Sequence, residues 1–244
     1  MNPSPSQPPL RPSEGGYAKG EQTRARLLEA ALDCFGPDGF ERVTTRQIAK
    51  RAGVNLPALT YYFGSKEGLY LACAQHIAGQ YSEALNPAAV QAQEALDAGL
   101  PAAVIGERLK GLMAALARFL LASSDAVNRN LFIQRAMANR SPAFDYLYDR
   151  LWGPGIEFAA VLVERAAGGR LTPTEAGVRA ALMITSLAGF GEGRAVIERA
   201  ISESDRIDYA IAALNEQIDA LVRPVVAAHP APFAAMSTTA GEKP

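Results

Sequence analysis

Apolar residues recur every three to four positions along most of the chain, a spacing that predicts amphipathic α-helices. The first such segment runs from Glu21 to Phe35, with charged side chains on the opposite face. Gly36 and Pro37 are expected to end it, because proline disfavours helical geometry in the residue before it. Residues 1–18 are rich in proline, serine and glycine, so they are expected to form a disordered arm.

The stretch from Thr44 to Lys66 carries the strongest local signals in the chain. Thr44, with Gln47 three residues later, predicts a capping box at the start of a second helix. Gly53 can adopt the positive φ of a tight turn, and Asn55 is expected to cap a third helix. Two short helices joined by such a turn predict a helix-turn-helix, within a three-helix DNA-binding head over residues 19–66.

The side chains that the core of this element does not need are polar, aromatic or basic. Such groups can contact base edges, thymine methyl groups and phosphates. The expected DNA-binding residues are Thr45, Arg46, Asn55, Leu56, Pro57, Thr60, Tyr61, Tyr62 and Lys66. The alternative is a helical hairpin whose tyrosines only cover its core, but several independent signals would then have to coincide by chance.

Beyond Lys66 the pattern predicts a helical ligand-binding and dimerisation domain over residues 67–228. Its fourth helix should reach Tyr81, followed by a connection over residues 86–101 with room for one short helix. Further helices are expected over 102–121, 125–138, 141–163, 172–190 and 205–226. Pro154 should kink the segment 141–163, although a loop between two ordinary helices fits nearly as well. Residues 229–244 are expected to be a disordered tail.

Helical phase alone suggests which residues of this domain could bind a small molecule or a second copy of the chain. A polar residue on an inward face, Gln134 or Arg135, favours a pocket, although a solvated edge position is the more common explanation. The predicted pocket consists of Leu116, Phe119, Gln134, Arg135, Tyr148 and Trp152. The last two helices, paired with their symmetry mates, would form a four-helix dimer interface through Leu182, Thr185, Leu187, Ile211, Leu214, Ile218 and Leu221. Alternatively, these two helices complete the core of a monomer.

Charge and composition exclude several other functions. The net charge of −1 argues against non-specific coating of nucleic acid, although residues 1–70 hold nine basic against seven acidic side chains. No apolar run approaches the roughly 18 residues of a membrane span, and the N-terminus lacks an export signal, so a cytoplasmic protein without membrane contact is expected. Cys34 and Cys73 fit as reduced core residues. His76 and His229 have no second ligand at metal spacing, so we expect no metal, no cofactor and no enzymatic activity.

The stretch TRARLLEAALDCFGPDGFERVTTRQIAKRAGVNLPALTYYFGSKEGLY resembles the TetR-type transcriptional regulators. The resemblance covers roughly Glu21 to Tyr81, and the rest of the chain is similar to the CecR-type subset with its long helical ligand domain. Thr60 stands where family members usually have tyrosine, and Tyr62 where histidine is common, so an operator sequence cannot be transferred.

The resemblance implies a homodimer that reads a palindromic operator on double-stranded DNA and is released by a small-molecule effector, most simply as a repressor. The competing function is a helical small-molecule-binding or protein-interaction module without sequence-specific DNA binding. Binding to the DNA upstream of the protein's own gene would separate the two.

Overall fold

The computed structural model describes residues 14–121, 126–192, 199 and 206–223. These residues form helices and no strand, so the all-α prediction is confirmed. The helices are α1 (Glu14–Asp38), α2 (Thr45–Ala52), α3 (Leu56–Phe63), α4 (Lys66–Asp97), α5 (Ala102–Leu121), α6 (Ala126–Ala138), α7 (Pro142–Leu147), a π-helical turn (Tyr148–Trp152), α8 (Gly153–Ala166), α9 (Pro173–Glu192) and α11 (Arg206–Val222). The expected arm up to residue 13 and the tail from 229 lie outside the described residues.

Helices α1, α2 and α3, called the head below, pack around a small apolar core. Leu27, Phe35, Ile48 and Leu59 are fully buried in it. The capping box predicted for α2 is present: the Thr44 hydroxyl accepts from the backbone N–H of Gln47, and the Gln47 side chain accepts from the N–H of Thr44 at 2.7 Å. Gly53 ends α2 at φ 66°, which an L side chain adopts only with strain.

Helix α1 is longer at both ends than the sequence predicts. It begins at Glu14, inside the expected arm, and continues through Gly36 and Pro37 to Asp38. Pro37 lies in the last turn of α1, which ends one residue later at Asp38. Gly39, at φ 80°, then ends it, and its N–H donates to the carbonyl of Phe35 at 2.9 Å.

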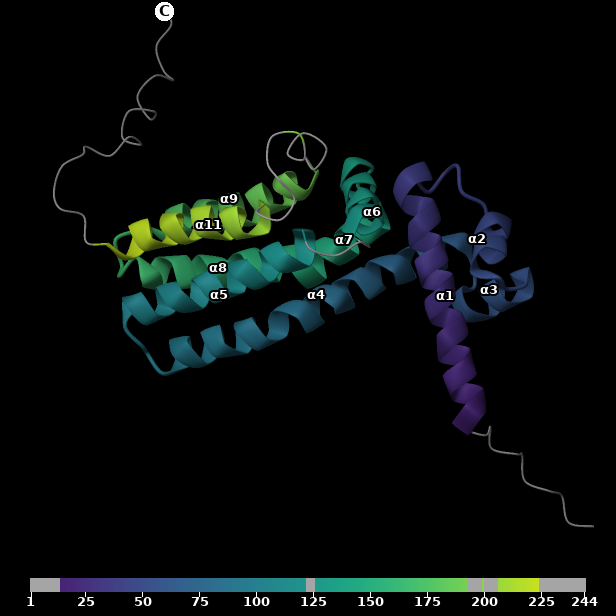
Figure 1. Ribbon diagram of the computed structural model, residues 1–244, viewed down its shortest axis with the longest axis horizontal. Coiled ribbons are helices and arrows are strands. Elements are labelled where there is room, and N and C mark those ends of the chain that lie inside the picture. The colour runs from purple at the N-terminus through teal and green to yellow at the C-terminus, as the bar shows by residue number, and fades with distance from the viewer. Residues whose placement is uncertain (1–13, 122–125, 193–198, 200–205, 224–244) are drawn as a thin grey trace, which may run out of the picture.

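The described helices from α4 to α11 are called the body below. Helices α4, α5, α8, α9 and α11 run roughly alongside one another, α6 is turned across them next to α1, and the head lies at one end (Figure 1). The connection expected over residues 86–101 is wrong, because α4 runs unbroken from the head to Asp97 and joins α5 by a short turn. Pro87 is tolerated inside α4 because it and Glu83 are exposed, so water can replace the backbone bond that proline removes. Ala92 and Ala95 are buried beyond it and hold this last part of α4 against α5.

The segment around Pro154 is neither a simple kink nor a loop. Helix α7 passes into the π-helical turn Tyr148–Trp152, in which the N–H of Gly153 donates to the carbonyl of Tyr148, five residues earlier. Pro154 then lies in the first turn of α8, where its missing N–H is not needed. The wide turn therefore absorbs the change of direction that the sequence pattern assigns to proline.

Candidate DNA-binding site and its contacts with the body

Helix α3 is positioned by one capping residue and one buried anchor. The Asn55 side-chain oxygen accepts from the backbone N–H of Ala58 at 3.0 Å, and Leu59 is fully buried in the head. Pro57, Thr60 and Tyr61 therefore lie on the exposed side of the helix, whereas Leu56 is half-buried. The Asn55 oxygen is used by the cap, which leaves its amide N–H groups as donors toward a partner.

The two adjacent tyrosines of α3 have different surroundings. Tyr61 is 84% exposed, the highest value among the exposed large apolar side chains. Tyr62 is half-buried, and a Cβ added to Gly20 of α1 would lie 3.4 Å from its hydroxyl. Their rings meet edge to face, with centroids 5.2 Å apart. Tyr61 is thus the side chain available to a partner, while Tyr62 supports it and contacts α1.

The basic residues near α3 are also held by the head. Arg46 is exposed on α2, with Thr45 half-buried beside it. The Lys66 ammonium lies over the Phe40 ring, 4.2 Å from its centroid, at the start of α4. The Ser65 hydroxyl caps α4 by accepting from the N–H of Gly68 at 3.0 Å. This stacking keeps the Lys66 charge close to the head surface, next to a helix N-terminus that favours phosphate.

Helix α6 of the body is hydrogen-bonded to α1 of the head, a connection that the sequence pattern did not indicate. The Arg135 Nε–H donates to the carbonyl of Gly36 at 2.7 Å, and its guanidinium also donates to the carbonyl of Pro37. The Asn128 amide donates to Asp33 at 2.8 Å. Asp33 also accepts from Arg51 of α2 at 2.8 Å, so α2, α1 and α6 share one polar network.

Close packing reinforces this contact between head and body. A Cβ on Gly36 would lie 2.6 Å from the Asn128 carbonyl oxygen, so α1 and α6 meet at a glycine. Beside them, Tyr70 of α4 contacts the rings of Phe35 and Phe40 from the head and of Phe132 from α6. Any shift of α6 must therefore disturb the C-terminal end of α1.

The six residues expected to form a ligand pocket fall into different environments. Leu116 is buried, and Phe119 packs against Tyr81 with ring centroids 4.4 Å apart. Tyr148 is exposed and Trp152 half-buried, and both contact Phe144. Gln134 is half-buried on α6. Arg135 donates to carbonyl groups of α1, a helix that contributes none of the other five residues, and its place in a pocket stays a prediction.

A buried cation lies beside Phe119. Arg129 of α6 is 4% exposed, its guanidinium carbon lies 4.1 Å from the Phe119 ring centroid, and it donates to the Phe119 carbonyl at 2.8 Å. Burial raises the pKa of the nearby Tyr81 to about 12, so this hydroxyl stays protonated at neutral pH. Arg129 was not singled out from the sequence, where it looks like an ordinary polar position of an amphipathic helix.

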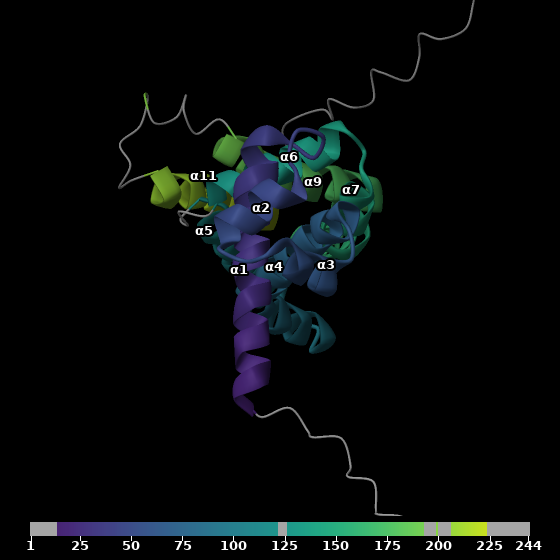
Figure 2. The ribbon, with the colours of Figure 1, turned by 90° about the vertical axis from the view of Figure 1, so that its right-hand side faces the viewer.

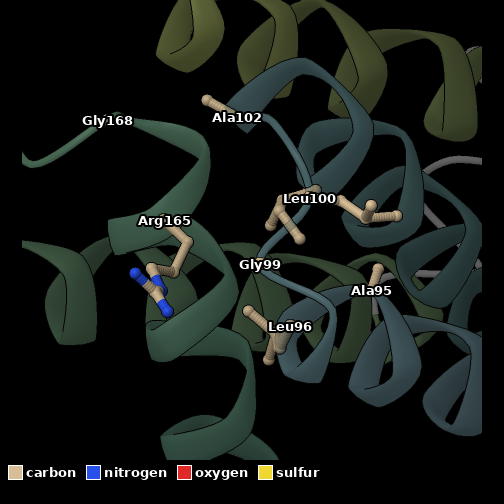
Figure 3. Close-up of a pocket in the computed structure, with 8 residues that line it drawn as sticks. Ala95, Leu96, Gly99, Leu100, Ala102, Arg165 and Gly168 are labelled. Carbon is tan, nitrogen blue, oxygen red and sulfur yellow. The ribbon is translucent and has the colours of Figure 1, made fainter.

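One cavity among the described residues lies at the end of the body remote from the head. Its volume is about 190 Å³, and Figure 3 shows Arg165 of α8 on one side, with Leu96 of α4 and Gly99 and Leu100 of the following turn on the other. None of the six expected pocket residues lines it.

The predicted dimer residues divide between the surface and the core. Leu182 and Thr185 of α9 are exposed, whereas Leu187, Leu214, Ile218 and Leu221 are buried in the protomer itself. Ile211 is half-buried. The three on α11 lie on a helix that packs against α5, and Leu187 of α9 belongs to the same apolar core of the protomer. The burial of those faces favours the alternative that the two helices complete the core of a monomer, and the dimer interface stays a prediction.

Two kinds of site are absent from the part of the chain that the structure describes. No three histidine, cysteine or acidic side chains gather where they could hold a metal ion. Likewise, no described helix is long and apolar enough to cross a membrane.

The head contains a capped helix-turn-helix with an exposed aromatic side chain on its second helix, and it is joined to a helical body. This is the architecture of helix-turn-helix DNA-binding proteins. Residues 27–73 match the family described as bacterial regulatory proteins, tetR family. The chain is 40% identical over 137 residues to the HTH-type transcriptional dual regulator CecR of Shigella flexneri, a match that covers 56% of this chain and 60% of CecR.

Solved structures agree on the fold. A TetR-like transcriptional regulator from Rhodococcus sp. RHA1 superposes with a TM-score of 0.57 at 23% identity, covering 85% of this chain and 96% of that one. AibR, solved in complex with isovaleryl coenzyme A and operator DNA, gives 0.59 at 16% identity over 79% of this chain and 97% of its own. The matched segment, residues 27–73, belongs to the tetR family, as its sequence motifs predict.

Proposed function

We propose that this chain is a transcriptional regulator, most simply a repressor, that binds an operator on double-stranded DNA through its head. The single observation that carries the proposal is the exposed face of α3, where Tyr61 is 84% exposed beside Thr60 and Pro57 on a rigidly capped helix. Arg46 and Lys66 flank this face and supply charge for phosphates, which fix the register of a protein on the duplex. No enzymatic activity is expected.

We further propose that two copies bind together to a palindromic site. Helix α3 has only eight residues, so one head can read only a few base pairs. Two heads in successive major grooves, about 34 Å apart along the duplex, would supply the missing affinity and specificity. In this arrangement Thr45, Arg46, Asn55 and Thr60 contact DNA together with Tyr61 and Lys66, while Tyr62 acts through its packing.

The proposed signal is a small molecule bound in the body. AibR shares the fold and was solved with both an acyl coenzyme A and operator DNA, which supports an effector as a class but does not identify it. We place the effector near Leu116 and Phe119, because the buried cation of Arg129 and the Tyr81 hydroxyl offer polar groups in an otherwise apolar interior. Arg129 and Asn128 are adjacent on α6, so a ligand that moves Arg129 also moves the contact with α1.

Release of DNA then follows from linkage. If effector and operator favour different positions of α6 relative to α1, binding of either one weakens binding of the other by the same factor. No direct contact between the two ligands is needed.

The test is a titration of the full chain, followed by fluorescence anisotropy, against short duplexes that tile the DNA upstream of its own gene. Tight binding to one duplex, at least about a thousandfold above the others, is expected for a specific regulator. Equal, weak and strongly salt-dependent binding to all duplexes would overturn the proposal and favour the alternative of a helical binding module without operator recognition.

A further inference from the structure

The N-terminal part of α1 projects beyond the rest of the head. From Lys19 onward, Leu27 is the first fully buried residue of this helix, and Figures 1 and 2 show the N-terminal turns of α1 extending past α2 and α3. From Lys19 to Leu27 the helix rises about 12 Å, which corresponds to about four base pairs of a duplex. The head itself does not need these turns for its core.

This projecting segment lies beside the recognition helix. Gly20 approaches the Tyr62 hydroxyl, at 3.4 Å from where its Cβ would be, and the Arg24 guanidinium lies 5.6 Å from the Phe63 ring centroid. Both partners belong to the C-terminal half of α3, next to the exposed Tyr61. A partner that covers α3 therefore comes close to the first turns of α1.

The basic and acidic side chains of this projecting segment lie on different faces of α1. Lys19 and Arg26 are exposed and seven residues apart, so they point in nearly the same direction, with Thr23 between them. Thr23 donates to the carbonyl of Lys19 at 2.8 Å and accepts from Arg26 at 3.5 Å, which leaves the lysine ammonium and most guanidinium donors for other partners. Glu21, two residues after Lys19, points to the opposite side because successive residues turn by 100°. No ion pair joins either cation to an acid among the described residues.

We propose that Lys19 and Arg26 form a second DNA contact, which binds phosphates flanking the sequence that α3 reads. Between Lys19 and Arg26 this face carries no acid, and it belongs to a helix that lies beside α3, so its charge matches that of a duplex backbone. Two cations about 10 Å apart along a helix can reach phosphates on one strand without contacting any base. The contact adds affinity and extends the footprint, but it does not add sequence preference. This inference rests on the proposed operator binding.

The experiment compares the full-length wild type with Lys19→Ala/Arg26→Ala on the best upstream duplex and on an unrelated duplex. Both side chains are exposed, so the variant should fold normally, which circular dichroism checks. We expect about tenfold weaker binding or more on both duplexes, with an unchanged ratio between them. The slope of log K against log salt should become shallower by about 0.9 for each phosphate that the variant no longer neutralises, so by up to roughly four units if two copies bind.

A second measurement varies the length of DNA. Extending the minimal duplex by about four base pairs at each end should strengthen binding of the wild type but not of the variant. The first control is Lys19→Arg/Arg26→Lys, which should bind as the wild type does because only the charge is needed. The second control, Arg118→Ala/Arg150→Ala, removes two exposed cations of the body and should keep the wild-type salt slope.

An unchanged salt slope in Lys19→Ala/Arg26→Ala, or an equal gain from longer DNA in both proteins, would overturn the inference while leaving operator binding intact. Failure of the wild type to prefer any upstream duplex would instead count against the proposed function itself.

Discussion

Among the residues of the head, we expect Tyr61 to contribute most to operator binding. Its ring packs against that of Tyr62 and is 84% exposed to solvent, so its removal should destabilise the fold little. We expect Tyr61→Ala to weaken operator binding by about 1–3 kcal/mol per contacted site, with unchanged helicity. Anisotropy titrations measure this loss. Tyr148→Ala, which removes another exposed tyrosine from the body, is the matched control, and equal affinities of the two variants would remove Tyr61 from the DNA-binding face.

His76 predicts a pH dependence of stability. It is half-buried on α4, with its Nε2 3.1 Å from the Gln80 amide nitrogen. Burial lowers its pKa, and the charge of Arg24 lowers it further, whereas Glu29 and Glu83 act in the opposite direction. The unfolded chain, with a histidine pKa of about 6.5, therefore takes up a proton at a higher pH than the folded chain does.

This difference in pKa means that the folded state loses stability as the pH falls. The stability contributed by neutral His76 is complete above about pH 6.5 and is lost as the pH falls toward the lowered pKa of the folded state. We expect the free energy of unfolding of the wild type to drop between about pH 7.5 and pH 5.5, and His76→Gln to reduce that drop. Urea titrations at several pH values measure it. Parallel curves for both proteins would mean that the pKa of His76 is the same in the folded and the unfolded chain.

At the scale of elements, local signals identified the helix-turn-helix correctly. The contacts of Thr44 with Gln47 and of Asn55 with Ala58 span three residues each, so the sequence alone contains both partners. The contact between α1 and α6 was not predictable in this way, because Arg135 and Gly36 are 99 residues apart and the pattern of each helix gives no sign of its partner. Single-sequence patterns also ended α1 and α4 too early, since proline was treated as a stop where an exposed turn tolerates it.

The contact between α1 and α6 predicts an unusual response to a glycine substitution. In Gly36→Ala the new methyl carbon would lie 2.6 Å from the Asn128 carbonyl oxygen, and this backbone atom cannot move without moving α6. We expect a loss of stability of about 1–3 kcal/mol from overpacking, even though alanine favours helix.

Gly111→Ala in α5 is the control, since nothing lies within 4 Å of its added carbon. It should stabilise the protein by about 0.5–1 kcal/mol through helix propensity alone. The opposite signs make the comparison decisive in a thermal or chemical denaturation. If both alanines stabilise the protein, α1 and α6 are not in close contact in solution.

At the scale of the whole molecule, the helices of the body were predicted from periodicity, but their burial was not. Periodicity marks the apolar face of α11 without telling whether it meets its own protomer or a partner. The structure assigns Leu214 and Ile218 to the protomer core, where they pack toward α5. What α9 leaves outside is the stripe of Val178, Leu182 and Thr185, and we propose that this stripe is where a second copy packs.

The last prediction concerns that stripe. Leu182 is 62% exposed, so Leu182→Glu should leave the protomer folded while placing a charge in the proposed dimer interface. Light scattering coupled to size exclusion should show a monomer, and operator affinity should fall by about two to four orders of magnitude, because a single head loses the effective concentration that its partner provides. Val90→Glu, which adds the same charge at an exposed apolar position of α4, should remain dimeric and bind DNA normally. A dimeric Leu182→Glu protein with full affinity would move the interface away from α9, whereas a monomeric one with full affinity would mean that DNA binding needs no second copy.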